Sequence, residues 1–199
     1  MYAKYLKRFL DICVSSVLLA ILWPLLVVVA MLVRVNLGTP VLFCHPRPGR
    51  HGETFTLFKF RTMSEARSND GTLLPDSDRL TRFGGFLRRT SLDELPELWN
   101  VLIGDMSLVG PRPLLIEYLD LYTEKQARRH EVRPGLTGLA QASGRNILEW
   151  NDRFLLDEEY VDNVSFRLDL AIAARTIKIL FTGYGVSARG ESTMKRFQG

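Results

Sequence analysis

The sequence predicts an α+β protein that is mostly α-helical, with one small β-hairpin and an N-terminal helix that enters a membrane. Three observations carry this prediction. Residues 12–33 are an uncharged apolar run with Pro24 near its middle. Residues 40–63 indicate two short strands around a turn rich in Gly and Pro, and after residue 79 apolar residues recur at helical spacing.

The apolar run is long enough to cross a bilayer. Its 22 residues would form a helix about 33 Å long, against about 30 Å for the hydrocarbon core. A secretory signal peptide is the less favoured alternative, because its apolar core is normally about 7–15 residues long and ends at a small-residue cleavage site. The residues around Arg34 offer no such site.

Basic residues flank both ends of this run, which argues against a simple crossing. Lys7 and Arg8 precede it and Arg34 follows it, so the positive-inside rule places both ends on the cytoplasmic side. Pro24 removes a backbone hydrogen bond in the middle of the run and kinks the helix. We therefore expect a re-entrant helix, broken at Pro24, in preference to a straight span.

The rest of the chain is expected to be helical after the hairpin. Residues 64–78 are polar and punctuated by Gly and Pro, as in a surface loop. The helices predicted after it cover residues 79–89, 96–103, 113–130, 148–162 and 166–182. The last one has an apolar stripe with basic residues around it, which suits either a core-facing helix or one lying on anionic lipid headgroups.

Composition indicates an anionic partner. The net charge is +4 and the sequence pI is about 9.2, which suits a phosphate-bearing substrate, an anionic membrane surface or nucleic acid. Nucleic acid is not expected, because the basic residues are not clustered with a groove-reading motif. Two cysteines without a CxxC motif, and three histidines without HxxxH, predict neither a disulfide framework nor a zinc site.

The stretch "RRTSLDELPELWNVL" places two adjacent acids, Asp93 and Glu94, just before Pro96. Ser91 and Glu94 match a capping box, which is the structural alternative. Proline is favoured as the first residue of a helix, so we expect the helix to begin near Pro96. Both acids then lie on the turn before it, where they can face one site. Their mutual repulsion favours a cation between them, such as Mg²⁺, which needs only one or two protein carboxylates beside substrate phosphates.

Arginines recur at turns and irregular segments: Arg88, Arg112, Arg133 and Arg145. Guanidinium groups bind phosphate in a bidentate manner. Any one of them could instead hold a loop by pairing with backbone carbonyls, and the residues alone leave both interpretations open.

The order of these features resembles the bacterial sugar transferase family, the monotopic phosphoglycosyl transferases. The matching stretches are "KRFLD" (7–11), Pro24, "FKFRTM" (58–63), "TRFGGFLRRTSLDELPELWNVLIGDMSLVGPRP" (81–113), "RPGLTGLAQ" (133–141) and "YVDNVSFRLDL" (160–170). Together they cover nearly the whole chain, and the long middle block is highly specific. One position departs from the family: Trp23 stands where members often have Ser, and an indole cannot cap freed carbonyls as a hydroxyl does.

Members of this family transfer a sugar-1-phosphate from a UDP-sugar to a polyprenyl phosphate, usually undecaprenyl phosphate, and release UMP. The resemblance implies that Asp93 forms a covalent phosphosugar intermediate and helps to bind Mg²⁺, with Glu94 as its partner. It also implies phosphate-handling roles for Arg88, Arg112 and Arg145 with Lys59 nearby. Lys7, Arg8 and Asp11 match the N-terminal signature at the membrane boundary.

These expectations divide the chain into three parts. Residues 1–36 form the re-entrant membrane segment, residues 37–186 a catalytic domain with interfacial amphipathic helices, and residues 187–199 a flexible tail. The implied location is the cytoplasmic face of the bacterial inner membrane, and the sequence sets neither the oligomeric state nor the sugar. Two other functions fit the same residues: a membrane-bound phosphatase that uses water as the acceptor, and a membrane-surface adaptor without turnover.

Overall fold

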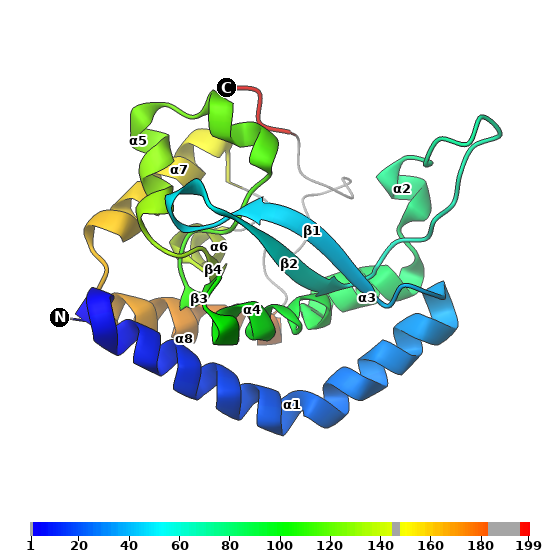
Figure 1. Cartoon of the computed structure of the whole chain (residues 1–199), viewed down its shortest axis with the longest axis horizontal. Helices are drawn as coiled ribbons and strands as arrows, with labels where there is room; N and C mark the ends of the chain where they lie inside the picture. The colour runs from blue at the N-terminus through cyan, green and yellow to red at the C-terminus, as the bar shows by residue number, and fades with distance from the viewer. Residues whose placement is uncertain (1, 145–147, 183–195) are drawn as a thin grey trace.

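The computed structural model describes residues 2–144, 148–182 and 196–199 and is mostly helical, as predicted. Figure 1 shows the long helix α1 (Lys7–Leu37) running along one side of a mixed body of helices and strands. The remaining α-helices are α2 (Asp76–Arg79), α3 (Arg82–Thr90), α4 (Glu97–Ile103), α5 (Glu124–Ala127), α6 (Leu139–Ser143), α7 (Trp150–Asp162) and α8 (Phe166–Thr182). The predicted helices over 148–162 and 166–182 are therefore confirmed as α7 and α8.

The predicted hairpin is confirmed. Strands β1 (Leu42–Pro48) and β2 (Thr54–Phe60) pair antiparallel around the turn that contains Gly49. A second pair of strands, β3 (Ser107–Val109) and β4 (Gly135–Thr137), is parallel and was not predicted. Three-residue strands in segments rich in Gly and Pro are too short to show an alternating pattern.

The predicted helix over residues 113–130 is wrong. The segment consists of a 3-10 turn (Ile116–Leu121), the short α5 and a second 3-10 turn (Arg128–Glu131). Thr123 interrupts the helical repeat, because it has extended backbone angles and forms a capping box with Gln126 that starts α5. Local capping chemistry therefore prevails over the apolar periodicity of this segment.

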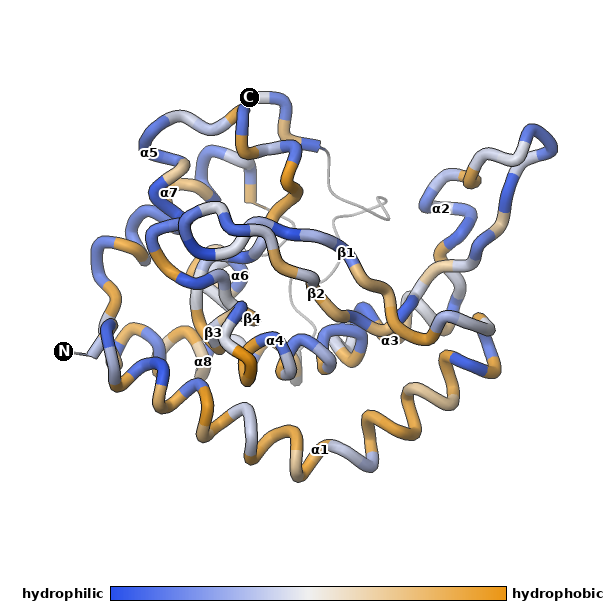
Figure 2. Tube along the Cα trace, in the orientation of Figure 1, coloured by the Kyte–Doolittle hydropathy of each residue, from blue (hydrophilic) through white to orange (hydrophobic). Residues whose placement is uncertain are grey.

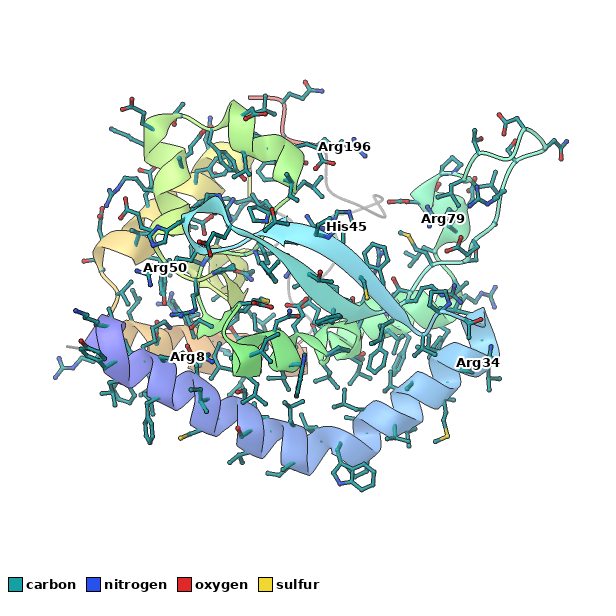
Figure 3. The ribbon with its side chains drawn as sticks, viewed as in Figure 1. Arg8, Arg34, His45, Arg50, Arg79 and Arg196 are labelled. Carbon is teal, nitrogen blue, oxygen red and sulfur yellow. The ribbon has the colours of Figure 1, made fainter. Side chains whose placement is uncertain are left out.

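The first residues of α1 attach this helix to the globular part of the protein. Lys7 Nζ lies 2.6 Å from an oxygen of Asp169 on α8. The Arg8 guanidinium donates to the carbonyls of Val101 and Leu102, at 2.6 and 2.8 Å, and so satisfies carbonyls in the last turn of α4. Figure 3 shows Arg8 on the side of α1 that faces the body.

Asp11 adds a buried contact one turn further along α1. Its Oδ1 accepts hydrogen bonds from the Ser107 hydroxyl at 3.1 Å and from the backbone N–H of Leu108 at 3.0 Å. The three residues that the sequence placed at the membrane boundary thus join α1 to α4, α8 and β3.

The other end of α1 also packs on the body. Val29 and Val33 form a buried cluster with Phe60 of β2 and Leu87 of α3. Arg61 donates to the carbonyl of Leu37, the last residue of α1. Both ends of the helix are therefore fixed to the same globular part.

Between these ends the helix is apolar and uncovered. Ile21 is 66% exposed and Trp23 is 61% exposed. Figure 2 shows the apolar character along this helix. Among the described helices, only the stretch Tyr2–Leu37 is long and apolar enough to cross a membrane.

Pro24 lies inside α1 rather than between two helices. The helix is continuous from Lys7 to Leu37, and Figure 1 shows it changing direction in its middle part. A bend at a proline follows from the missing N–H and the clash of its ring with the preceding turn. The expected complete break at this residue is not confirmed.

Only the last four residues of the expected flexible tail are described. Among them, Phe197 is buried against the aromatic rings of Tyr118, Phe154 and Trp150. Its backbone N–H also donates to the Tyr118 hydroxyl at 3.2 Å.

Candidate functional site

The two adjacent acids lie at the entrance of α4, where the position of Pro96 predicted them. Pro96 is the residue before the first turn of α4, and Asp93 and Glu94 belong to the 3-10 turn Leu92–Glu94 that leads into it. Ser91, with φ 55° and ψ 19°, reverses the chain between α3 and this turn. The Ser91 side chain makes no capping hydrogen bond, so the capping-box alternative is wrong.

Glu94 is held by two cations. Its Oε1 accepts hydrogen bonds from Lys59 Nζ at 2.8 Å and from the Arg112 guanidinium at 2.6 Å. Burial by itself would raise the pKa of Glu94, but Arg112 and Lys59 outweigh this and hold the pKa far below its ordinary value. Glu94 is therefore a fixed negative charge.

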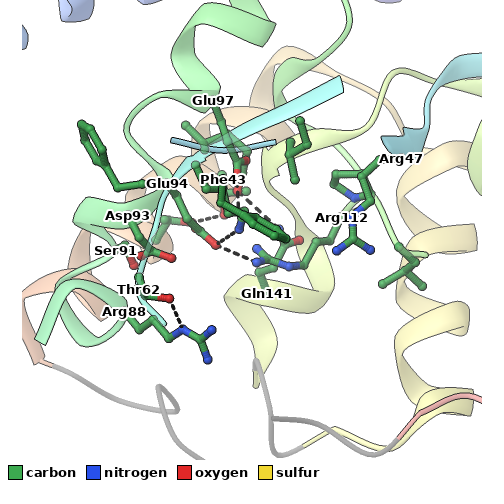
Figure 4. A pocket seen from close by; sticks show the side chains of 18 of the residues that line it. Phe43, Arg47, Thr62, Arg88, Ser91, Asp93, Glu94, Glu97, Arg112 and Gln141 are labelled. Atoms are coloured by element: carbon green, nitrogen blue, oxygen red, sulfur yellow. Dashed lines mark hydrogen bonds and ion pairs between the residues drawn. The ribbon is translucent and has the colours of Figure 1, made fainter. Parts of the chain in front are cut away.

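Asp93 has a different environment. Its side chain is 7% exposed, and its pKa is raised by burial and by the neighbouring negative charge of Glu94. In the described part of the chain, no residue forms an ion pair or hydrogen bond with its carboxylate. Figure 4 shows Asp93 between Arg88 and Glu94 at the wall of a pocket.

A third carboxyl group, which the sequence analysis did not select, completes this cluster. Glu97 is 2% exposed and lies 2.9 Å from Lys59 Nζ. Burial raises its pKa to about 7. Its spacing of three residues from Glu94 places the two on one side of the turn, which is the signal that could have identified it.

Arg88 is positioned by the contact of α3 with the end of the hairpin. Its Nε donates to the Thr62 hydroxyl at 3.1 Å. Gly84, one turn earlier on α3, lies so close to Thr62 that an added Cβ would be 1.8 Å from the Thr62 carbonyl oxygen. The absence of a side chain at residue 84 therefore allows α3 to bring Arg88 next to Asp93.

The backbone of Arg112 is held in place by the buried ion pair of Arg129 with Asp157. The Arg129 guanidinium donates to the Arg112 carbonyl at 2.6 Å and lies 3.0 Å from the Asp157 carboxylate. Both Arg129 and Asp157 are about as buried as core residues. They fix the backbone from which Arg112 reaches Glu94.

These residues line one cavity of about 1390 Å³. The charged side chains that line it include Asp93, Glu94, Glu97, Lys59, Arg88, Arg112, Arg47 and Arg153. The same cavity reaches apolar side chains of α1 and α8, including Val14 and Ile177. A charged site that opens toward an apolar helix can receive a substrate with an ionic head and a hydrocarbon chain.

The predicted site residues divide into three groups. Lys59, Arg88, Asp93, Glu94 and Arg112 come together in the cavity. Lys7, Arg8, Asp11 and Pro24 do not line it; the first three join α1 to the body, and Pro24 lies in its exposed middle. Arg145 lies outside the described residues.

The donor set fits a magnesium ion that takes most of its ligands from a substrate. In the described ranges, no group of three or more His, Cys, Asp or Glu residues could hold a metal ion. Mg²⁺ commonly uses one or two carboxylates plus phosphate oxygens and water. The Asp93 carboxylate, at the cavity wall without an ion-pair partner among the described residues, can supply such a ligand, whereas Glu94 is engaged by Lys59 and Arg112.

Comparison with known proteins agrees with this geometry. The family model described as bacterial sugar transferase matches residues 2–183. The chain is 51% identical to the sugar transferase EpsL of Bacillus subtilis, over 98% of this chain and 96% of that protein. It is 39% identical to the undecaprenyl-phosphate galactose phosphotransferase of Salmonella typhimurium, over 89% of this chain and 41% of that protein. It is 43% identical to the undecaprenyl-phosphate glucose phosphotransferase of Komagataeibacter xylinus, over 86% of this chain and 35% of that protein.

The chain thus spans almost all of the Bacillus relative and about two fifths or less of the other two. A family match over most of the chain, and identity of this level over nearly the full length of one relative, leave no other assignment. The chain belongs to the bacterial sugar transferase family.

Proposed function

We propose that this protein transfers a sugar-1-phosphate from a UDP-sugar to a polyprenyl phosphate, through a covalent phosphosugar on Asp93. One observation carries the proposal: Asp93, which has no ion-pair partner in the described chain, lies beside Arg88 and beside the cluster of Glu94, Lys59 and Arg112. The cavity that they line also reaches apolar side chains of α1. The relatives named undecaprenyl-phosphate galactose and glucose phosphotransferases support the same acceptor and class of reaction.

The reaction has two displacement steps at one phosphorus atom. A carboxylate oxygen of Asp93 attacks the phosphorus that carries the sugar, the bond to the bridging oxygen breaks, and UMP leaves with that electron pair. An oxygen of the polyprenyl phosphate then attacks the same phosphorus, and the bond to Asp93 breaks. The products are a polyprenyl diphosphate sugar and the restored carboxylate.

The cations around Asp93 allow one anion to approach another. Arg88 and Arg112 can each form bidentate contacts with phosphate oxygens. The very low pKa of Glu94 suits it to holding Lys59 and Arg112 in place rather than to accepting a proton. Bound Mg²⁺ would offset the charge of the substrate phosphates.

The shape of α1 supports attachment to a single leaflet. Both of its ends are fixed to the globular part, through Arg8 and Asp11 at the start and through Val33 near the end. A helix held in this way cannot place its ends on opposite sides of a bilayer. The exposed apolar middle would dip into the cytoplasmic leaflet of the inner membrane and return, which keeps the cavity at the level of the lipid phosphates.

Other helices have apolar side chains exposed that suit the same interface. Trp99 and Ile103 on α4 are exposed, as are Leu170 and Ile177 on α8. In Figure 1 α4 and α8 lie on the side of the body that faces α1. We propose that these helices lie at the headgroup level as interfacial amphipathic helices.

The test is intact-protein mass spectrometry of the lipid-solubilised protein with Mg²⁺ and a panel of UDP-sugars, without any acceptor. The names of the relatives make UDP-galactose and UDP-glucose the first donors to try. We expect a mass gain of one sugar phosphate in the wild type and none in Asp93→Asn. Turnover of that variant should fall by roughly 10⁴-fold or more, as for loss of other catalytic nucleophiles.

The second half of the experiment separates the alternatives. Undecaprenyl phosphate should discharge the adduct and form a lipid-linked sugar, whereas a phosphatase would release free sugar phosphate into water. Removal of Mg²⁺ with a chelator should prevent adduct formation. Product formation from the wild type without any adduct would exclude the covalent intermediate, and an Asp93→Asn variant with unchanged behaviour would favour the adaptor.

A further inference from the structure

Arg47 lines the cavity but does not belong to the cluster around the acids. It lies on β1 opposite Phe55 of β2. Figure 4 shows Arg47 beside Arg112 and away from Arg88. Its Nε is buried without a hydrogen-bond partner. Of the carboxylates that the structure describes, none forms an ion pair with it.

Arg153 on α7 adds a third guanidinium near this end. It lines the same cavity, stacks on the ring of Trp150 at 5.6 Å, and donates from Nε to the Leu148 carbonyl at 3.1 Å. Burial and the positive charge of Arg112 lower the pKa of both Arg47 and Arg153. Each of these two side chains therefore lies close enough to Arg112 to be repelled by its charge.

Repulsion of this kind is relieved when an anion binds. Most carboxylates near these arginines are engaged by other cations: Glu94 pairs with Arg112, Glu97 with Lys59 and Asp157 with Arg129. Glu117 is exposed to solvent, and although its charge acts on Arg47, the two form no ion pair in the described part of the chain. Arg88, which lies beside Asp93 and away from Arg47, can bind the phosphate group whose phosphorus Asp93 attacks. The guanidinium groups of Arg47, Arg112 and Arg153 can therefore bind a second phosphate.

We propose that Arg47, together with Arg112 and Arg153, forms a second phosphate subsite that holds the phosphate of the departing UMP, on the other side of the acid pair from Arg88. The inference rests on the proposed function, since a UDP-sugar presents two linked phosphates of which only one is attacked. Tyr118 and Trp150 also line the cavity near these arginines. Aromatic rings beside a phosphate subsite suit a nucleotide, whose base can stack on them, better than a polyprenyl chain.

The first experiment measures binding without turnover. UMP is titrated calorimetrically into wild type, Arg47→Gln, Arg47→Lys and Arg50→Gln in the same lipid nanodiscs. Arg50 is the matched control, because it lies three residues after Arg47, in the hairpin turn, is exposed, and donates to the Glu131 carbonyl without lining the cavity. Loss of a charge-assisted phosphate contact should raise the Kd for UMP about tenfold to a hundredfold in Arg47→Gln.

Arg47→Lys keeps the charge but loses the planar bidentate group, so its Kd should lie between those of wild type and Arg47→Gln. Arg50→Gln should bind UMP as the wild type does. Thermal unfolding of each variant identifies a folding defect, and if Arg47→Gln does not fold, Arg47→Lys against Arg50→Gln decides the question. An unchanged Kd for UMP in the Arg47 variants would overturn the subsite.

The second experiment distinguishes the two substrates that carry a phosphate. The preformed phosphosugar adduct is discharged either by UMP, which reverses the first step, or by undecaprenyl phosphate. Arg47→Gln should slow discharge by subsaturating UMP and leave discharge by the lipid unchanged. The opposite pattern would assign the subsite to the lipid phosphate and overturn the nucleotide assignment. If no donor forms an adduct on the wild type, the proposed function fails, while the UMP titration still tests the subsite.

Discussion

Three carboxyl groups within five residues differ in charge because each has different neighbours. Glu94 contacts Lys59 and Arg112 and remains ionised, whereas burial favours the protonated form of Glu97 and raises the pKa of Asp93. Neighbouring acids whose pKa values are moved apart can perform different tasks in one site. Under the proposed mechanism, Glu94 holds the cations and Asp93 reacts with the substrate.

The raised pKa of Glu97 predicts how the stability of the protein depends on pH. Its pKa is about 7 in the folded protein and about 4.3 in an unfolded chain. Between these values the folded state binds more protons than the unfolded state, so this residue makes stability fall as pH rises. Gln does not titrate, so its introduction at position 97 removes this dependence on pH. The free energy of unfolding of Glu97→Gln minus that of the wild type should therefore increase from about pH 5 to about pH 8.

The measurement is the free energy of unfolding in denaturant at several pH values, in one detergent. Glu53→Gln is the control, because Glu53 is exposed in the hairpin turn, and its pH profile should follow that of the wild type. A constant difference between Glu97→Gln and wild type at all pH values would show that Glu97 does not change its protonation in this range.

Single residues were predictable where a local rule marked them. Pro96 located Asp93 and Glu94 at a helix entrance, because proline is favoured at that position and disfavoured in a helix interior. Arg47 lies in a strand and has no such signal. Glu97 has only its spacing of three residues from Glu94, and it otherwise resembles an ordinary acid in a first helical turn. Their roles depend on which distant segments fold against them.

At the scale of elements, the approach of α3 to the end of β2 sets the geometry near Asp93. Two consecutive glycines on α3 differ sharply in their surroundings. A Cβ on Gly84 would lie 1.8 Å from the Thr62 carbonyl oxygen, whereas a Cβ on Gly85 would have no atom within 4 Å. Only the first is required for the contact that positions Arg88.

We predict that Gly84→Ala displaces α3 and lowers both stability and adduct formation. The Thr62 backbone cannot move without shifting the hairpin, so overpacking should cost about 1–3 kcal/mol in the free energy of unfolding. Gly85→Ala is the control and should stabilise the protein by about 0.4–1 kcal/mol, since Ala favours the helix. Denaturant unfolding and the rate of adduct formation measure both effects, and equal behaviour of the two variants would refute the role of the close contact.

Elements with a strong periodic pattern were predictable, and those made by local capping or by distant pairing were not. The hairpin, α4, α7 and α8 follow from apolar spacing and from turn residues. The segment 113–130 has helical spacing but is divided at Thr123 by its own capping box. The pairing of β3 with β4 joins segments that are short and distant in sequence, so no local pattern indicates it.

At the scale of the whole molecule, α1 is a long helix whose two ends both pack against the globular part. The buried carboxylate of Asp11 and the guanidinium of Arg8 fix its first turns, and the cluster around Val33 fixes the last ones. The sequence indicated from its charges that both ends share one side of the membrane. The contacts favour the same proposed arrangement, because the globular part would have to unfold locally for either end to cross a membrane.

The last prediction tests this arrangement in membranes. In a variant with Cys13 and Cys44 replaced by Ser, single cysteines are introduced as Lys4→Cys and Asn36→Cys, both at exposed positions near the ends of α1. A membrane-impermeant maleimide should label both sites in inverted inner-membrane vesicles and neither in spheroplasts, because both ends remain with the globular part on the cytoplasmic side.

Trp23→Cys is the matched probe for the middle of α1. The Trp23 side chain is 61% exposed in the protein, so only lipid can protect a cysteine there. It should remain unlabelled in both preparations and react once detergent dissolves the membrane. Labelling of Lys4→Cys and Asn36→Cys from opposite sides would establish a spanning helix, and α1 would then have to leave at least one of its contacts with the body. Labelling of Trp23→Cys in intact vesicles would instead place α1 outside the leaflet, and the cavity would lose its direct access to a lipid-borne acceptor.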